Sequence, residues 1–430
     1  MKLADIIDTF ISGDWGEESP TQDTPNAAYC VRGADIVPIT NHNFTDIPQR
    51  YVCDRTKETK LLAADDLVIE KSGGSPTQST GRIVYVSEDL IKAKGNVVCS
   101  NFCTAFRVKA GWNPLYVYYF WQNVYNYGAF FNFEGKTSGI KNLQLDNALS
   151  AIDIEYLPLE KQNQIVDSLA SIDEKIKVNR QINDNLEAMA KQLYDYWFVQ
   201  FDFPNEEGKP YKSSGGAMVW NEKLKREIPQ GWDSSMLQSI CTIKRGASPR
   251  PIDDFMDESH KGMPWVKISD ATNSNSPFMT TIKEHIILDG VPKSVKVIPN
   301  TLIVSNSATP GIPKFIQIEA CVHDGWLVLT DYQEIYKYYL YYVIKMIRHN
   351  LLHIASGSIF KNLKTDYLKE FICITPSTEI LSKYHNLVKP IMQEILLLQR
   401  DTEVLTKQRD ELLPLLMNGQ ATVNYHLSDD

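Results

Sequence analysis

Two stretches of the chain carry apolar residues at steps that alternate between four and three positions. The first continues through Asn179 and Asn183, and the second through Thr402. A seven-residue apolar repeat is typical of helices that pack as a coiled coil, so we expect two long helices that pack on each other antiparallel. The first would span roughly 42 Å as an α-helix. The apolar positions are Ile165, Leu169, Ile172, Ile176, Leu186 and Leu193, then Val388, Ile391, Ile395, Leu398, Leu405 and Leu412.

The sequence before each helical stretch consists of short runs of β-forming residues that end at turn signals. The two blocks resemble each other in order. Val31–Ile36 corresponds to Val266–Ala271, 235 positions later, and Asp146 near the end of the first block corresponds to Asp366. Each match is weak alone, but their shared order predicts that the chain repeats one plan twice.

These patterns predict an α+β fold in which two pseudo-symmetric globular domains are joined by two long antiparallel helices. Between the first helix and the second domain, the content of Pro, Gly and Ser indicates a linker. The expected boundaries are a first domain at 1–157, a helical spacer at 158–200, the linker at 201–230, a second domain at 231–375, a second helical spacer at 376–420 and a tail at 421–430.

The composition, with 43% hydrophobic and 23% charged residues, is typical of globular proteins. No segment approaches the ~18 apolar residues of a membrane span, and the N-terminus lacks the apolar core of a signal peptide. We therefore expect a cytoplasmic protein with no membrane association. The seven cysteines form no CxxC pair, which predicts reduced thiols and no metal site.

The net charge of −9 argues against a general nucleic-acid binder. The surplus acid lies largely in the helical stretches, however, and residues 231–370 carry 15 basic against 14 acidic side chains. DNA binding by this chain would therefore need local basic faces or basic partner subunits.

Several short stretches of the sequence resemble those of the specificity subunit of Type I restriction–modification systems. The stretch Ile228–Trp232 and the stretch Pro264–Asp270 look like parts of a target-recognition domain of this family. Tyr156–Gln162 resembles its first helical region, and Gly208–Met218 and Lys71–Pro76 are also family-like. The resemblance spans essentially the whole chain, and its most specific parts are the repeat and the linker.

The resemblance implies that each globular domain is a target-recognition domain that reads one half of a bipartite site in double-stranded DNA. The helices would set the spacing between the half-sites and dock two methyltransferase subunits, which methylate adenine with S-adenosylmethionine. Restriction subunits, driven by ATP and Mg, would join them to translocate and cleave DNA. No cofactor is expected in this chain itself.

The chain lacks the catalytic motifs that an enzyme of such a system would need. Asn113-Pro114-Leu115-Tyr116 lacks the second proline of an amino-methyltransferase motif, and Ser72–Ser75 lacks the Gly-Lys-Ser/Thr end of a P-loop. We therefore expect a non-catalytic subunit. Two alternatives are a fragment of a fused restriction–methylation enzyme and an assembly scaffold that does not read DNA.

The candidate DNA-contact residues gather around the loop at Ser72–Gly74 and its counterpart at 306–311. Glycine allows close approach to a phosphate or base edge, although a plain hairpin turn would account for the same loop. The flanking residues supply hydrogen-bond donors, and further basic residues are weaker candidates. The full set is Arg32, Lys71, Ser72, Gly73, Gly74, Thr77, Gln78, Arg82, Lys244, Arg245, Arg250, Lys267, Asn306, Ser307, Thr309 and Lys314.

Overall fold

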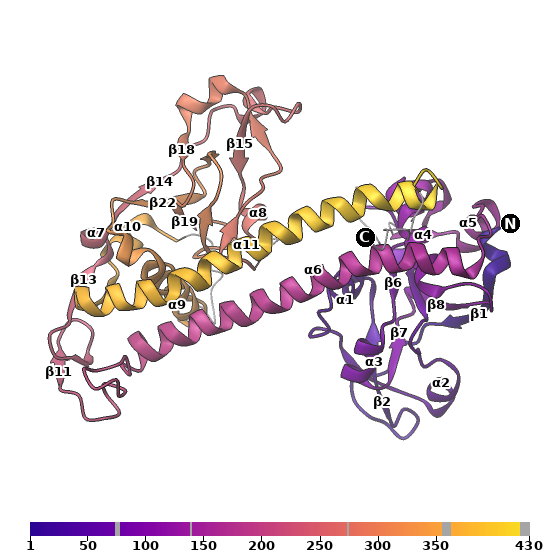
Figure 1. Cartoon of the computed structure of the whole chain (residues 1–430), viewed down its shortest axis with the longest axis horizontal. Coiled ribbons are helices and arrows are strands. Elements are labelled where there is room, and N and C mark those ends of the chain that lie inside the picture. Colours follow the sequence, from indigo (N-terminus) through magenta and orange to yellow (C-terminus); the bar gives the residue numbers. More distant parts are fainter. Residues whose placement is uncertain (74–77, 138–139, 273–274, 355–362, 422–430) are drawn as a thin grey trace, which may run out of the picture. The chain divides into compact units, whose positions relative to one another are not determined.

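The computed structural model describes residues 1–73, 78–137, 140–272, 275–354 and 363–421. The chain divides into two compact units, one formed by Met1–Val178 with Thr402–Asp430 and the other by Asn179–Asp401. The boundary between the units falls inside both long helices, α6 (Leu159–Tyr194) and α11 (Thr378–Met417), so each unit contains a part of each helix (Figure 1).

The first unit contains three sheets, and two of them pack on a shared hydrophobic core. Leu67 and Ile69 on the central strand face α4 and α6, whereas Val68 between them faces the second sheet, as the two-residue period of a strand requires. The four-stranded sheet has the order β1 (Ile7–Ser12), β8 (Cys103–Val108), β4 (Leu67–Glu70), β6 (Ile83–Tyr85). The second sheet has the order β3 (Gln49–Val52), β2 (Asn26–Val31), β7 (Val97–Cys99), and a third has the order β5 (Ser72–Gly73), β10 (Ile140–Leu143), β9 (Glu134–Thr137).

The helices of the first unit pack around these sheets. The Asn113 side chain caps α4 by accepting hydrogen bonds from the backbone N–H groups of Leu115 and Tyr116, at 2.9 and 3.2 Å. The segment that resembles a methyltransferase motif is therefore the start of an aromatic helix, and its Trp121 donates a hydrogen bond to the Gly81 carbonyl. The helices are α1 (Ile36–Thr40), α2 (Asp54–Thr59), α3 (Glu88–Lys94), α4 (Pro114–Asn126) and α5 (Leu145–Ala151).

The second unit contains the corresponding sheets. The larger has the order β14 (Thr242–Arg245), β22 (Trp326–Thr330), β19 (Leu302–Ser305), β20 (Pro313–Ile316), β16 (Phe278–Met279), and the next has β17 (His285–Ile286), β15 (Met263–Val266), β21 (Ala320–Val322), β18 (Val295–Val297). Two-stranded sheets pair β11 (Met218–Asn221) with β12 (Arg226–Pro229) and β13 (Asp233–Met236) with β23 (Ile372–Thr375). The helices are α7 (Leu237–Ile240), α8 (Ile268–Thr272), α9 (Lys337–Ile354) and α10 (Thr365–Glu370).

The two units repeat one topology, as the sequence predicted. The parallel pair β2–β7 recurs as β15–β21, and the order β1-β8-β4-β6 recurs as β14-β22-β19-β20. Arg32 and Lys267 occupy equivalent positions, and the backbone N–H of each donates a hydrogen bond to the aspartate three residues later. The backbone N–H of Arg32 donates to Asp35 at 2.8 Å, and that of Lys267 donates to Asp270 at 2.9 Å.

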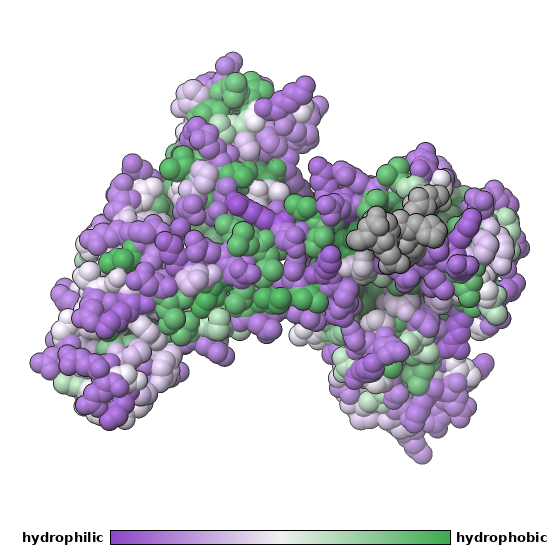
Figure 2. Space-filling view, in the orientation of Figure 1, coloured by the Kyte–Doolittle hydropathy of each residue, from purple (hydrophilic) through white to green (hydrophobic). Residues whose placement is uncertain are grey.

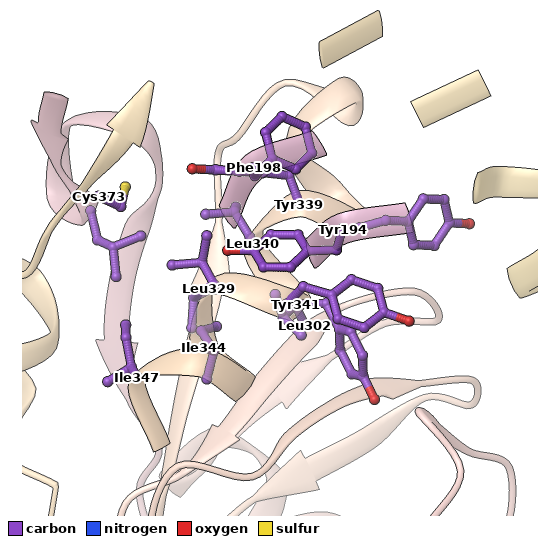
Figure 3. Close-up of a cluster of buried hydrophobic side chains, with 14 of the residues drawn as sticks. Tyr194, Phe198, Leu302, Leu329, Tyr339, Leu340, Tyr341, Ile344, Ile347 and Cys373 are labelled. Atoms are coloured by element: carbon purple, nitrogen blue, oxygen red, sulfur yellow. The ribbon is translucent and has the colours of Figure 1, made fainter. Parts of the chain in front are cut away.

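An aromatic cluster joins the end of α6 to the sheet of the second unit (Figure 3). Tyr194 and Phe198, the latter in a π-helical turn (Asp195–Val199), pack against Tyr339 on α9. The rings of Phe198 and Tyr339 meet edge to face, with centroids 4.9 Å apart. Such pairs are favourable geometries for aromatic side chains, and they fix the helix end on the domain.

The apolar positions predicted for the two long helices form a buried seam, and near the C-terminal end of α6 the buried face shifts by one residue. All twelve predicted apolar positions are buried or half-buried. Met189, which continues the seven-residue pattern, is 42% exposed, while Ala190 and Tyr194 are buried. An α-helix has 3.6 residues per turn, so a strict seven-residue stripe drifts around it, and the buried face moves by one position.

Two polar pairs, Asn179 with Asp401 and Asp173 with Arg409, form hydrogen bonds between α6 and α11, each pair within one unit. In the second unit the Asn179 amide donates to Asp401 at 2.7 Å. In the first unit Asp173 accepts from Arg409 at 3.0 Å and from the Tyr119 hydroxyl at 2.6 Å. Polar pairs of this kind favour one register of a helix pair over its neighbours.

The predicted linker at 201–230 is a folded part of the second unit. The Asp202 carboxylate accepts hydrogen bonds from the Ser213 backbone N–H and hydroxyl, at 2.7 and 2.6 Å. The Phe203 ring stacks on both Tyr211 and Trp232. The Gly, Pro and Ser content that indicated a connection thus forms turns between these anchoring residues.

No helix in the described part of the chain is long and apolar enough to cross a membrane. Apolar residues are visible along the long helices in the view of Figure 2, among a largely hydrophilic surface. All seven cysteines are free thiols, and all except Cys53 are buried.

Candidate nucleic-acid interface

The loop that follows the central strand is held by the same main-chain hydrogen bonds in both units. In the first unit the Lys71 N–H donates to the Phe102 carbonyl at 2.8 Å, and the Lys71 carbonyl accepts from the Leu143 N–H at 2.7 Å. In the second unit Asn306 makes the equivalent bonds to Gly325 and Leu363, at 2.8 and 2.6 Å. The repeat therefore aligns Lys71 with Asn306, one residue after β4 and β19.

Arg82 is committed to an internal ion pair. Its guanidinium donates two hydrogen bonds to Glu70, at 2.8 and 2.6 Å, and the Glu70 side chain is only 3% exposed. These hydrogen bonds raise the pKa of Arg82. In this structure the predicted DNA contact is instead the partner of a buried carboxylate.

Gly73, one of the predicted DNA-contact residues of this loop, leaves space for the Glu70 carboxylate. Gly73 has a φ of +141°, and a Cβ there would lie 2.7 Å from a Glu70 carboxylate oxygen. Gly33 approaches the same carboxylate, since its Cβ would lie 2.4 Å away. The fold itself thus requires Gly73, which favours the hairpin-turn interpretation at this position. The neighbouring candidates Gly74 and Thr77 lie outside the described residues.

The other side of the loop is joined to the β9–β10 hairpin. The Ser72 hydroxyl donates to the Asn142 side chain, and the Lys141 ammonium donates to the Gln78 carbonyl at 3.2 Å. Lys141 also pairs with Glu134 at 3.2 Å. These contacts hold Ser72 in place and leave the Gln78 residue exposed.

Lys71 lines an open groove of about 560 Å³ in the first unit. No carboxylate of the described residues lies within ion-pair distance of its ammonium. The groove combines an aromatic ring, hydroxyls, amides and one carboxylate. Its lining residues are Phe10, Ser12, Lys71, Thr104, Leu143, Gln144, Leu145, Asp146 and Asn147.

In the second unit, three predicted residues converge on Asp324. The Arg245 guanidinium donates to the Asp324 carbonyl at 2.7 Å, Arg250 lies 3.4 Å from its carboxylate, and the Asn306 amide donates to its carbonyl at 3.3 Å. Burial would raise the pKa of Asp324, but the hydrogen bond from Ser248 and the charge of Arg250 hold it below its ordinary value. Arg245 and Arg250 remain 59% and 78% exposed, so both can also reach a ligand.

The remaining candidates have different surroundings. Arg32 pairs with Asp35 at 2.8 Å and Lys267 with Glu284 at 2.5 Å, and both cations are partly exposed. Lys244 is exposed on β14. Ser307 and Thr309 are half-buried in the loop after β19.

Lys314 does not have the position that the sequence suggested. It pairs with Ile303 inside the sheet, as Val84 pairs with Val68 in the first unit, so it corresponds to Val84 and does not flank the loop as Arg82 does. Its side chain is 2% exposed, and burial lowers its pKa to about 8. This burial argues against the predicted DNA contact.

Sequence reasoning did not select several groove residues. Phe10 and Ser12 stand on the first strand, and Gln144, Asp146 and Asn147 come where α5 begins. A signal was available, because Asp146 and Asp366 align in the repeat. Asp324 was missed because its partners lie 74 and 79 residues away in sequence.

The duplicated fold defines a chain with two copies of one recognition-type domain, and comparison with known families agrees. The family described as Type I restriction modification DNA specificity domain matches residues 18–188 and again residues 229–400. The chain therefore belongs to this family, and the sequence-based assignment is confirmed. The predicted α+β architecture of two repeated domains is confirmed as well.

Named relatives carry the same description. The chain is 26% identical over 285 residues to the specificity subunit of the Type I restriction enzyme MjaIX from Methanocaldococcus jannaschii, a match that covers 64% of this chain and 62% of that protein. It is 25% identical over 327 residues to the HindI specificity subunit from Haemophilus influenzae, covering 64% of this chain and 70% of that protein. The crystal structure of the S subunit of a Type I restriction–modification system from M. genitalium has a similar fold, with a TM-score of 0.55 at 14% identity over 97% of this chain and 95% of that chain.

Proposed function

We propose that this chain is the non-catalytic DNA-recognition subunit of a Type I restriction–modification complex, in which each unit reads one half of a bipartite site. The observation that carries the proposal is the coincidence of two specificity-domain matches with two units of equal topology. Side chains at equivalent positions differ between the units, as at Lys71 and Asn306. Two copies of one fold with different side chains suit two different half-sites.

The long helices are suited to binding partner subunits. Val178, Ile182 and Met189 on α6 are each about two-fifths exposed and follow one another at steps of four and seven residues. Residues at these steps share one face of a helix, and an exposed apolar stripe is typical of a protein interface. We assign this face to two methyltransferase subunits, with ATP-driven restriction subunits joining the complex.

In this scheme the chemistry belongs to the partners. S-adenosylmethionine would bind to the methyltransferase subunits, and ATP with Mg to the restriction subunits. The present chain contributes the choice of sequence and the distance between half-sites. Because its net charge is −9, we expect tight DNA binding only in the complex, where partners add contacts to phosphates.

A domain exchange tests the proposal. Residues 231–370 are replaced by the equivalent block of another family member, and the methylated motif of the reconstituted methyltransferase is sequenced. One half of the motif should change while the other half and its methylation stay the same. A motif that changes in both halves, or in neither, would contradict the assignment of one half-site to each unit.

The two alternatives are distinguished by a methyl-transfer assay and a DNA-binding assay. A fused enzyme would transfer labelled methyl groups from S-adenosylmethionine to DNA without partners. A scaffold that does not read DNA would leave the complex with the same affinity for target and non-target duplexes at every salt concentration.

A further inference from the structure

We propose that base edges of each half-site are read at one equivalent surface in the two units, where the loop after the central strand meets α5 or α10. This inference rests on the proposed function and specifies its site. In the first unit the surface is the groove lined by Lys71, Asp146 and Asn147. We further assign the aspartate that both copies share, Asp146 and Asp366, to an amino group of a base.

The main-chain geometry establishes that the two surfaces correspond. Lys71 and Asn306 are held by equivalent hydrogen bonds, which join them to Leu143 and Leu363. Two residues after these leucines, α5 begins at Leu145 and α10 at Thr365. Asp146 and Asp366 are therefore both the second residue of their helix.

The first strand contributes a further matched position. Ser12 is the last residue of β1 and pairs with Thr104, and Arg245 is the last residue of β14 and pairs with Leu327. Since β8 and β22 correspond in the two sheets, Ser12 and Arg245 occupy equivalent places. Two of the predicted DNA contacts, Lys71 and Arg245, thus belong to this surface, whereas Asn306, the counterpart of Lys71, is only 5% exposed.

The chemistry of the groove suits base edges better than phosphates. A carboxylate only accepts hydrogen bonds, and its charge repels a phosphate. In the major groove its partners are the amino groups of cytosine and adenine, while lysine and the amides recognise guanine and adenine. Phe10, 48% exposed at the edge of the groove, adds an apolar surface of the kind that contacts a thymine methyl group.

The side chains vary where two different sequences must be read. The exposed Ser12 is replaced by Arg245 and the exposed Asn147 by Tyr367 at equivalent positions, and Lys71 by the buried Asn306. These exchanges alter charge, size and hydrogen-bonding capacity. The aspartate is kept, so each half-site should contain one base whose amino group is read by a carboxylate.

The repeat supplies a matched pair of variants, Asp146→Asn and Asp366→Asn. Both residues are exposed, and neither Asp146 nor Asp366 contributes to the described core. The whole chain is assembled with its methyltransferase subunits, and methylation is measured on every single-base variant of the target. Asp23→Asn and Asp289→Asn, exposed residues of the same units, control for the loss of one negative charge.

Asp146→Asn should reduce discrimination at one base pair of the first half-site by between about 5-fold and about 150-fold. The second half-site should keep its full discrimination, which also shows that the complex is folded. Asp366→Asn should give the mirror-image result, and the two controls should leave the motif unchanged.

The inference is overturned if either Asp146→Asn or Asp366→Asn leaves both half-sites fully discriminated, or if one variant affects both equally. If the domain exchange still moves one half-site in that case, the proposed function stands and only the location of the reading surface is wrong. If the domain exchange itself fails, the proposed function is wrong.

Discussion

Replacing Arg82 with alanine should destabilise the first unit. The variant would leave the Glu70 carboxylate, 3% exposed, without the two hydrogen bonds of 2.8 and 2.6 Å that now satisfy it. Gly33 and Gly73 pack against the same carboxylate, so little space is open for water beside it. Breaking a buried ion pair by removing one partner typically costs about 3–5 kcal/mol, and we expect a loss of that size.

The measurement is denaturant unfolding of the whole chain, combined with hydrogen exchange of the β4 backbone to localise the change to the first unit. A double variant, Arg82→Met with Glu70→Gln, removes both charges and should recover most of the lost stability. The reasoning would be refuted if Arg82→Ala unfolded like the unmodified chain while its complex lost affinity for DNA. Arg82 would then be a DNA contact, as the sequence suggested.

Three further predictions follow from the same contacts. Lys314→Met should stabilise the second unit by up to about 3 kcal/mol at pH 7, because burial lowers the pKa of this ammonium and so disfavours its charged form in the fold. The folded pKa is about 8 and the unfolded one near 10.4, so the unmodified chain gains stability as pH rises between them, and the advantage seen in thermal unfolding should shrink at pH 10. Asp173→Ala should cost about 1–3 kcal/mol in denaturant unfolding, since Arg409 and Tyr119 lose their acceptor, and an unchanged midpoint would contradict this. Four residues inserted after Leu186 should lengthen the unspecified DNA spacer by about one or two base pairs, as read from the methylated motif, because a helical turn rises ~5.4 Å and a base pair ~3.4 Å.

The features that could be predicted from the sequence are those that depend on spacing. The seven-residue seam requires only that apolar residues recur, and its predicted positions are buried or half-buried. The repeat requires only that similar residues follow in the same order, and the hydrogen bonds of Arg32 and Lys267 show that the alignment was right in detail.

The surroundings of the basic residues could not be predicted in this way. Arg82 and Lys314 both looked like cations beside a loop, yet one is paired with a buried carboxylate and the other lies inside a sheet. The difference depends on the lengths of the two loops. Arg82 comes twelve residues after Glu70, whereas the second copy reaches its next strand at Pro313, eight residues after Ser305. A lysine near the loop in sequence is therefore already within the strand.

The way in which the recognition loop is held explains how one fold can serve two different sequences. The hydrogen bonds that fix Lys71 and Asn306 use only main-chain N–H and carbonyl groups, so they do not depend on which side chain stands there, proline excepted. A lysine and a partly engaged asparagine can therefore occupy the same place without moving the strands on either side. By contrast, the glycines that accommodate Glu70 are tied to a buried side chain and cannot vary freely. Change in specificity should consequently accumulate at positions such as 71, where the backbone is fixed from both sides and the side chain lines an open groove.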